Sequence, residues 1–192
     1  ARVALISSFA TPALARCEHD ETKIPSDYPA PVFLIGFPRS GTTLLEQILD
    51  SHPGIVAMEE KGAVATMVNA FLAISNGQPG ALAELNDETI AQLRQIYFRE
   101  AKNHVDIRPD TLLLDKMPLN TVVVPIIWRV FPEARFILAI RHPCDASLSC
   151  LMQNFAANEA MANFSSLEKT ARTYATVMEA WRKYIDLLPI VY

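Results

Sequence analysis

The chain has 192 residues, of which 51% are hydrophobic and 20% are charged, a balance that is typical of a globular domain and excludes a disordered tail. With 17 basic against 21 acidic residues the net charge is −4, so the chain lacks the basic excess of nucleic-acid-binding proteins. Its apolar runs are too short to span a bilayer. We therefore expect neither nucleic acid nor a membrane as a partner, and we expect local cations and backbone amides to bind any anionic ligand.

Cysteine usage points to a reducing compartment. Cys17, Cys144 and Cys150 form no CxxC pair and lie at no spacing typical of metal ligands, so we predict no metal site. Because a small, odd number of cysteines is typical of reduced proteins, we expect a cytoplasmic location.

Residues 1–30 are expected to precede the main domain. Residues 1–15 resemble the tail of an upstream helical element, although their apolar stretch after Arg2 also loosely resembles a secretory signal peptide. Residues 16–30 are polar and predict a linker. At the other end, residues 189–192 are typical of the start of a buried strand, so we expect the chain to be an excerpt of a longer polypeptide.

Strands alternate with helices along the chain. In order, the patterns predict a strand at 32–35, a helix at 42–50, a strand at 55–58, helices at 61–75 and 87–105, a strand at 112–114, a helix at 120–131, a strand at 136–140, a helix opened by Pro143 and a helix at 165–187. Asp87 is expected to cap its helix, Pro125 to kink or delay its own, and Ser165 to form a capping box with Glu168. This alternation predicts an α/β domain with a mostly parallel sheet flanked by helices.

Three strands are followed by loops that carry charge or glycine, at 36–43, 115–118 and 141–145. Because ligands of parallel sheets bind beyond the carboxyl ends of the strands, we expect these loops to converge.

The loop at 36–43 carries the most information. Its GxxxxG spacing between a strand and a helix favours phosphate binding by backbone N–H groups at the positive end of the helix. A nucleoside-triphosphatase P-loop has the same frame but requires Lys where Thr42 stands, and the cation here is Arg39 inside the loop. A P-loop kinase or nucleotide hydrolase therefore stays an alternative that this sequence disfavours.

Residues 37–44 resemble the 5′-phosphosulfate-binding loop of sulfotransferases, which use 3′-phosphoadenosine 5′-phosphosulfate (PAPS) and release 3′-phosphoadenosine 5′-phosphate (PAP). The resemblance implies that the donor is bound by Pro38, Arg39, Ser40, Gly41, Thr42, Thr43 and Leu44. A second segment, 136–149, is similar to the 3′-phosphate-binding motif of the same family, with Arg141 at a strand end and Ser149 eight residues later. A planar guanidinium and a hydroxyl are suitable donors to a phosphate.

The resemblance covers 31–192, which we take as a sulfotransferase domain with a P-loop-containing nucleotide-binding fold. Its form is most similar to tyrosylprotein sulfotransferases and to bacterial sulfotransferases linked to tetratricopeptide (TPR) repeats. Residues 1–30 could then join the domain to an upstream TPR region. Family members continue beyond 189 with further helices and a nucleotide-clamping segment, so we expect the domain to be C-terminally incomplete and to lack its adenine contacts.

The resemblance also implies catalytic roles. Glu60 lies 21 residues after Arg39, at the offset of the general base in the tyrosylprotein branch, and Glu59 beside it would raise its proton affinity by repulsion. Lys116 matches the lysine that contacts the phosphosulfate oxygens, a charge-stabilising task that Arg39 would share. No magnesium is required by this scheme.

The reaction implied is sulfuryl transfer from PAPS to an acceptor hydroxyl or amine on a peptide, carbohydrate, lipid or small molecule. A tyrosylprotein-type enzyme would instead work in the secretory lumen. The non-enzymatic alternative is a catalytically silent module that binds PAP.

Overall fold

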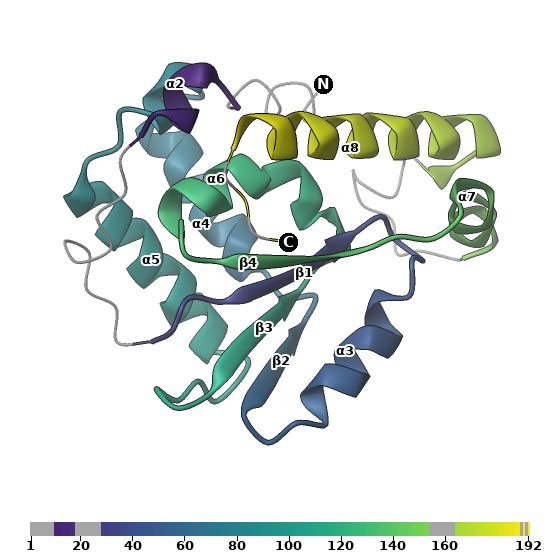
Figure 1. Cartoon of the computed structure of the whole chain (residues 1–192), viewed down its shortest axis with the longest axis horizontal. Coiled ribbons are helices and arrows are strands. Elements are labelled where there is room, and N and C mark those ends of the chain that lie inside the picture. The colour runs from purple at the N-terminus through teal and green to yellow at the C-terminus, as the bar shows by residue number, and fades with distance from the viewer. Residues whose placement is uncertain (1–9, 18–27, 154–163, 189, 191) are drawn as a thin grey trace.

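The computed structural model describes residues 10–17, 28–153, 164–188, 190 and 192, and four strands form one parallel sheet (Figure 1). The strands are β1 (Val32–Gly36), β2 (Ile55–Glu59), β3 (Leu112–Lys116) and β4 (Arg135–Ala139). They lie in the order β2-β3-β1-β4, with Val32 opposite Leu114 of β3 and Arg135 of β4. The predicted α/β fold with a parallel sheet is confirmed.

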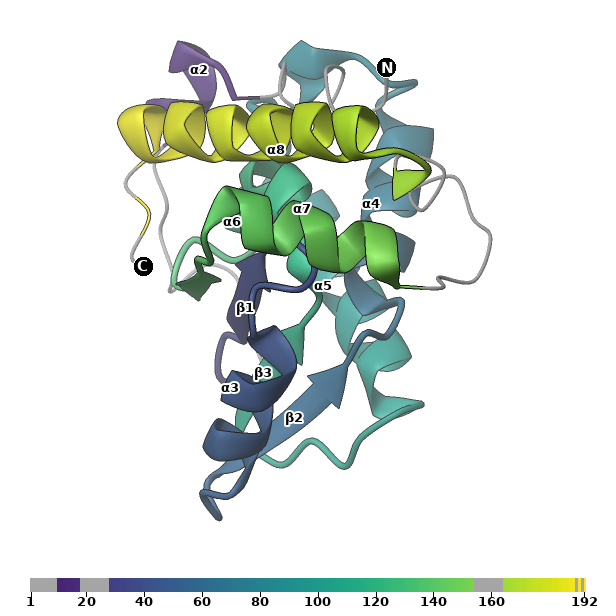
Figure 2. The same ribbon diagram turned by 90° about the vertical axis from the view of Figure 1, so that its right-hand side faces the viewer.

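Helices cover both faces of this sheet. The α-helices are α2 (Pro12–Ala15), α3 (Thr42–Asp50), α4 (Ala63–Ile74), α5 (Asp87–Lys102), α6 (Val124–Val130), α7 (Pro143–Met152) and α8 (Leu167–Leu187), and the 3-10 helices are η2 (Pro79–Leu82) and η3 (Pro118–Val123). Figures 1 and 2 show α3 on one side of the sheet and α4 and α5 on the other. Helices α7 and α8 pack against each other at the end of the molecule that faces the viewer in Figure 2.

Alternation along the strands decides which side chain meets which helix layer. Phe33 of β1 joins the main core, where its ring lies 5.7 Å from that of Phe136 and 6.1 Å from that of Tyr97. On β3, Asp115 reaches Tyr97 of α5, whereas Lys116 reaches Glu46 of α3. Two consecutive charged residues are thus buried on opposite faces of the sheet.

Three predicted helix details are wrong. Asn86, not Asp87, caps α5 by accepting a hydrogen bond from the Thr89 N–H at 2.9 Å, and the helix ends at Lys102. Ser166, not Ser165, caps α8, so Glu168 falls one position too early for a capping box and instead pairs with Arg172 at 2.7 Å. In both places two adjacent residues, Asn86 and Asp87 or Ser165 and Ser166, are suitable caps, and the local sequence alone does not decide between them.

The helix predicted at 120–131 is divided. Residues 118–123 form the 3-10 helix η3, and α6 follows it. Pro125 lies in the first turn of α6, where its missing N–H costs no hydrogen bond, so it starts the helix and does not kink it.

The segments outside the sheet are only partly described. The one-turn helix α2 is capped by Thr11, and Leu14 is buried in the main core. The predicted linker lies mostly outside the described residues. The strand expected at 189–192 is not formed at Ile190 or Tyr192, the two of these residues that the structure describes. Within the described ranges, no helix combines the length and apolarity needed to cross a bilayer.

Candidate active site

The loop at 36–43, which is predicted to bind phosphate and is called the phosphate loop below, links the end of β1 to the start of α3. Gly36 ends the strand where a Cβ atom would lie 2.6 Å from the carbonyl oxygen of Ala139 on β4, so only glycine fits. Arg39 and Gly41 adopt φ angles of 69° and 91°, in the left-handed region. Helix α3 then begins at Thr42, after Gly41 in the capping position, and among the described residues it has no side-chain cap and no acidic residue in its first turn. The N–H groups of this turn are therefore suited to an anion.

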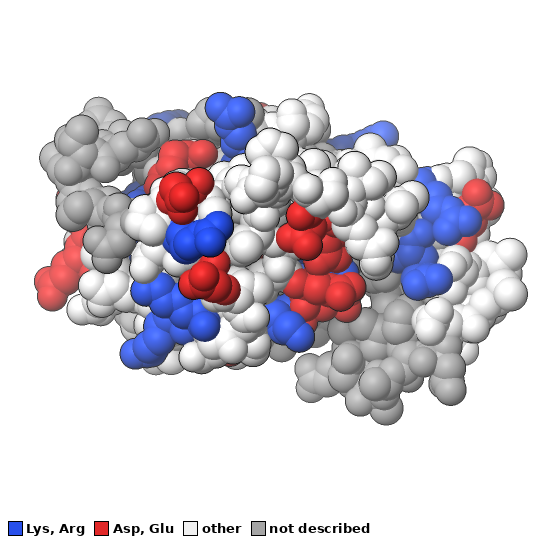
Figure 3. Space-filling view, turned by 90° about the horizontal axis from the view of Figure 1, so that it is seen from below, with Lys and Arg blue, Asp and Glu red and all other residues white. Residues whose placement is uncertain are grey.

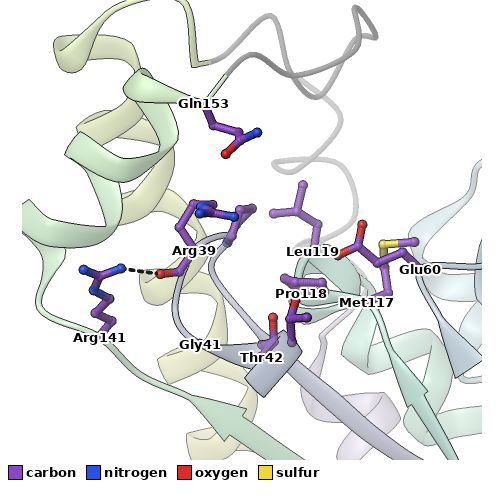
Figure 4. Close-up of a pocket in the computed structure, with 11 residues that line it drawn as sticks. Arg39, Gly41, Thr42, Glu60, Met117, Pro118, Leu119, Arg141 and Gln153 are labelled. Carbon is purple, nitrogen blue, oxygen red and sulfur yellow. Dashed lines mark hydrogen bonds between the residues drawn. The ribbon is translucent and has the colours of Figure 1, made fainter. Parts of the chain in front are cut away.

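Helix α7 and the segment that leads into it from β4 hold this loop on one side. The Arg141 guanidinium donates to the Arg39 carbonyl at 3.1 Å, shown as the dashed line in Figure 4, and the Arg39 Nε donates to Ser149 Oγ at 3.1 Å. The Cys150 thiol, buried in the packing of α7, donates to the Pro38 carbonyl at 3.5 Å. The two predicted phosphate-binding segments are thus in direct contact, although they are about a hundred residues apart in sequence.

The loops after β1 and β3 are joined by a buried hydroxyl. Thr121 Oγ1 accepts from the Gly36 N–H at 2.9 Å and donates toward the carbonyls of Gly36 and Pro118 at 2.9 and 2.8 Å. This side chain therefore fixes the position of η3 relative to the phosphate loop.

All three predicted loops converge on one cavity of about 410 Å³. Its lining consists of Pro38, Arg39, Gly41, Thr42, Thr43, Glu60, Met117, Pro118, Leu119, Arg141 and Gln153. Figure 4 shows the two arginines on one side and Glu60 on the opposite side, with Thr42 and Pro118 between them. The cavity thus places cations and the first-turn amides of α3 opposite a carboxylate.

A buried lysine stands behind Glu60. Lys116 Nζ lies 3.0 Å from Glu59 Oε1, 3.0 Å from Glu60 Oε1 and 3.3 Å from Glu46 Oε2. Burial alone lowers the pKa of Lys116, but hydrogen bonds to Glu59 and Glu60 and the charges of Glu60 and Glu46 outweigh it, so the pKa is raised and the ammonium is held charged. Glu59 and Glu60 are therefore not two isolated like charges, because both accept from the same ammonium.

The backbone also singles out Glu60. Its φ angle is 49°, in the left-handed region, and its N–H donates to the Lys116 carbonyl at 2.8 Å. A non-glycine residue costs about 1–3 kcal/mol in such a conformation, and residues of this kind cluster at functional sites. Arg39 and Glu60 are two of the three non-glycine residues with positive φ in the described part of the chain.

A scan against family models matches the sulfotransferase family over residues 31–190. This range includes both phosphate loops, Glu60 and Lys116. The chain belongs to the sulfotransferase family.

Individual relatives agree with this assignment. The chain is 30% identical to the human protein-tyrosine sulfotransferase 1 over 115 residues, which are 57% of this chain and 30% of that protein. It is also 30% identical to the nodulation protein NoeE of Sinorhizobium fredii over 127 residues, 62% of this chain and 30% of that protein. An uncharacterized protein of Aquifex aeolicus is 30% identical over 164 residues, 80% of this chain and 21% of that protein. The chain thus spans a third or less of the length of these three relatives.

Not every predicted site residue of this sulfotransferase-family chain lines the cavity. Leu44 is 65% exposed on α3 and is not among the described lining residues. Ser40 is buried with no hydrogen-bond partner for its hydroxyl among the described residues. Lys116 lies behind Glu60, and Ser149 lines an adjoining hollow together with Arg39 and Arg141.

Glu46, Thr121 and Gln153 are contributors that sequence reasoning missed. Glu46 follows Thr42 by one helical turn, so a charged residue on the buried side of α3 was a usable signal. Thr121 and Gln153 carry no such signal, because a threonine in a turn and a glutamine at a helix end are ordinary residues there.

On the face of the molecule shown in Figure 3, charged side chains gather in small groups. Figure 3 shows a compact acidic patch in the middle of this face and a mainly basic group toward one end, whereas acidic and basic side chains alternate toward the other end. At the site, Arg39 and Arg141 line one hollow together, and Glu46, Glu59 and Glu60 surround Lys116.

Proposed function

We propose that this chain transfers a sulfuryl group from PAPS to an acceptor hydroxyl or amine. The observation that carries the proposal is the single cavity in which the phosphate loop and Arg141 lie opposite Glu60. PAPS carries phosphate groups at its 5′ and 3′ positions, which suits the two loops that carry Arg39 and Arg141. Glu60 on the opposite side of the cavity is placed to act as a base on an acceptor that enters from that side. Family membership and relatives named as protein-tyrosine sulfotransferases support the same reaction.

The residues fit the donor chemically. The loop amides and Arg39 would bind the 5′-phosphosulfate, and Arg141 with Ser149 would bind the 3′-phosphate. PAPS supplies the activated sulfuryl group, whose transfer places negative charge on the phosphate oxygen that is left. Arg39 would stabilise this charge from the cavity wall, whereas Lys116, which lies behind Glu60 and is not among the described lining residues, would act on it at longer range.

Glu60 would take the proton from the acceptor. Its carboxylate lines the cavity and is oriented by Lys116, so one oxygen is held at 3.0 Å from the ammonium. General base catalysis of this kind contributes about 10²–10⁴-fold to the rate.

The first test separates base catalysis from donor binding. Glu60→Gln is expected to lower kcat about 10²–10⁴-fold, while PAP affinity stays within about threefold, because of the two substrates the base would contact only the acceptor. Turnover is measured as PAP release from PAPS with a panel of tyrosine peptides, phenols and saccharides, and PAP binding by titration calorimetry.

Glu59→Gln is the matched control. Glu59 contacts the same ammonium at 3.0 Å but is not among the described residues that line the cavity, so its loss of kcat should be far smaller. Equal loss of turnover and PAP affinity in Glu60→Gln would refute the base assignment. Tight PAP binding without turnover on any acceptor would leave a PAP-binding module, and binding of ATP with magnesium in preference to PAP would favour the kinase class.

A further inference from the structure

Helix α3 places a carboxylate where its sequence pattern predicts an apolar side chain. Leu44 and Ile48 are 65% and 57% exposed, whereas Glu46 between them is only 5% exposed. A helix that packs on a sheet normally buries its apolar side chains, so hydrophobic packing does not explain this inversion. Burial without a partner would cost several kcal/mol, and the side chain therefore requires a cation.

That cation is Lys116. Its ammonium is fully buried, and Glu46 Oε2 approaches it at 3.3 Å from the α3 side of the sheet. The other two carboxylates around the ammonium, those of Glu59 and Glu60, are more than half exposed. Glu46 is thus the only one of the three that the fold keeps out of solvent.

The carboxylates of Glu46, Glu59 and Glu60 would interact differently with Lys116 once Glu60 acts as a base. When Glu60 accepts a proton, it loses the charge that holds it to Lys116. Glu59 is exposed and can turn to water. Glu46 is enclosed between α3 and the sheet, and its charge stays opposite the ammonium throughout.

Resting on the proposed function, we propose that Glu46 is a positioning residue that anchors the Lys116 ammonium from the inner side and thereby keeps Lys116 in place beside Glu60 during turnover. Glu46 is not among the described residues that line the cavity, so it acts through Lys116. The pKa of Glu46 is raised, because burial and the charges of Glu59 and Glu60 together outweigh the lowering effect of Lys116.

The kinetic test uses Glu46→Gln, which keeps the shape of the side chain but removes its charge. We expect kcat to fall about tenfold at unchanged PAP affinity, because Lys116 is less firmly held and neither phosphate loop is touched. The groups that face Glu46 are Lys116, Glu59 and Glu60. With the Glu46 charge gone, the Lys116 charge acts more strongly on Glu60, so the acid limb of the pH profile of kcat/KM should move to lower pH. Glu46→Asp, which keeps the charge, should recover part of the rate.

Asp50→Asn is the matched control for charge removal on the same helix. Asp50 lies one turn beyond Glu46 on α3, is exposed, and accepts from the Ala57 N–H at 2.8 Å. It should leave kcat and the pH profile unchanged. A folded Glu46→Gln variant with wild-type kcat, or a loss equal to that of Asp50→Asn, would overturn the positioning role.

A second arm tests the contact without any turnover. In the wild-type background Glu46→Gln should lower the midpoint of thermal unfolding, because Lys116 loses a partner. In a Lys116→Met background the same substitution should raise the midpoint, because Glu46 is then an unpaired buried charge. The same sign in both backgrounds would overturn the anchor. If the wild-type chain transfers no sulfuryl group at all, the proposed function fails, and this arm still decides whether Glu46 anchors Lys116.

Discussion

Asp115 and Lys116 are consecutive residues of β3 with opposite surroundings. Lys116 meets three carboxylates, whereas Asp115 meets Tyr97, whose hydroxyl donates to Asp115 Oδ2 at 2.9 Å. The other Asp115 oxygen is buried without a hydrogen-bond partner among the described residues. Burial raises the pKa of Asp115 to about 7, and the Tyr97 hydrogen bond offsets only part of this effect. Asp115 is thus a buried acid that the proposed reaction does not use.

Asp115 should make the fold less stable as the pH rises. Because its pKa is 3.8 in the unfolded chain and about 7 in the folded one, the folded state binds more protons between these values. Stability from this group is complete below about pH 4 and is lost as the pH rises through about 7. Asp115→Asn should remove this pH dependence, so that the variant gains stability over the wild type between pH 4 and 8.

Chemical denaturation at pH 5 and pH 8 measures the effect. Asp110→Asn is the control, because Asp110 is exposed and its neutralisation should leave the pH dependence of unfolding as in the wild type. A wild-type free energy of unfolding that rises over this range relative to Asp115→Asn would contradict the assignment.

At the scale of elements, β1 and β4 pack tightly against each other next to the phosphate loop. Gly36 lies opposite Ala139, and the carbonyl of Ala139 occupies the space of a Cβ atom. The pairing of the last residue of β1 with β4, and with it the position of the phosphate loop, therefore requires glycine at position 36. Glycine is required here because two strands pack closely, so a residue with a side chain cannot replace Gly36 unless the strands move apart.

Gly36→Ala should destabilise the protein by about 2–3 kcal/mol, because the two strands must separate to accept the methyl group. For a chain of this size the midpoint of thermal unfolding should fall by about 4–12 °C. Calorimetry measures both quantities. Gly80→Ala is the matched control, since a Cβ at Gly80 meets no atom within 4 Å and should change stability by less than about 0.5 kcal/mol. A Gly36→Ala variant as stable as Gly80→Ala would show that the strands can move apart freely.

At the scale of the whole molecule, the cavity is built from segments that are far apart in sequence. Arg39, Glu60 and Arg141 follow β1, β2 and β4, and 102 residues separate the partners of the bond from Arg141 to the Arg39 carbonyl. A ligand that contacts all these loops should therefore stabilise the fold as a whole.

PAP at 100 times its dissociation constant should stabilise the chain by about 2.7 kcal/mol and raise its unfolding midpoint by about 5–11 °C. Arg141→Ala should weaken PAP about 10- to 100-fold, because a charge-assisted hydrogen bond to phosphate is lost. The same variant should affect adenosine 5′-phosphosulfate much less, since this ligand lacks the 3′-phosphate. Thermal shift and calorimetric titration measure these effects.

Arg135→Ala serves as control, because Arg135 is an exposed arginine at the opposite end of β4. It should bind both ligands as the wild type does. Equal weakening of the two ligands in Arg141→Ala would contradict a 3′-phosphate site at this residue.

The sequence by itself determined the parallel α/β fold and the convergence of three loops on one cavity. These follow from local patterns, because apolar runs predict buried strands and the carboxyl ends of parallel strands share one edge of the sheet. The roles of Glu60, Lys116 and Arg141 were predicted from family motifs and stay proposals, and the structure adds that Arg39, Glu60 and Arg141 line one cavity.

Only the tertiary structure decided the surroundings of the charges. The cluster of Lys116 with Glu46, Glu59 and Glu60 joins helix α3, strand β3, the last residue of β2 and the residue that follows it. Sequence spacing gives the face of an element on which a side chain lies, but the partner on that face is set by the packing of another element. The same reason explains why β3 buries an acid toward α5 and a base toward α3 within two residues.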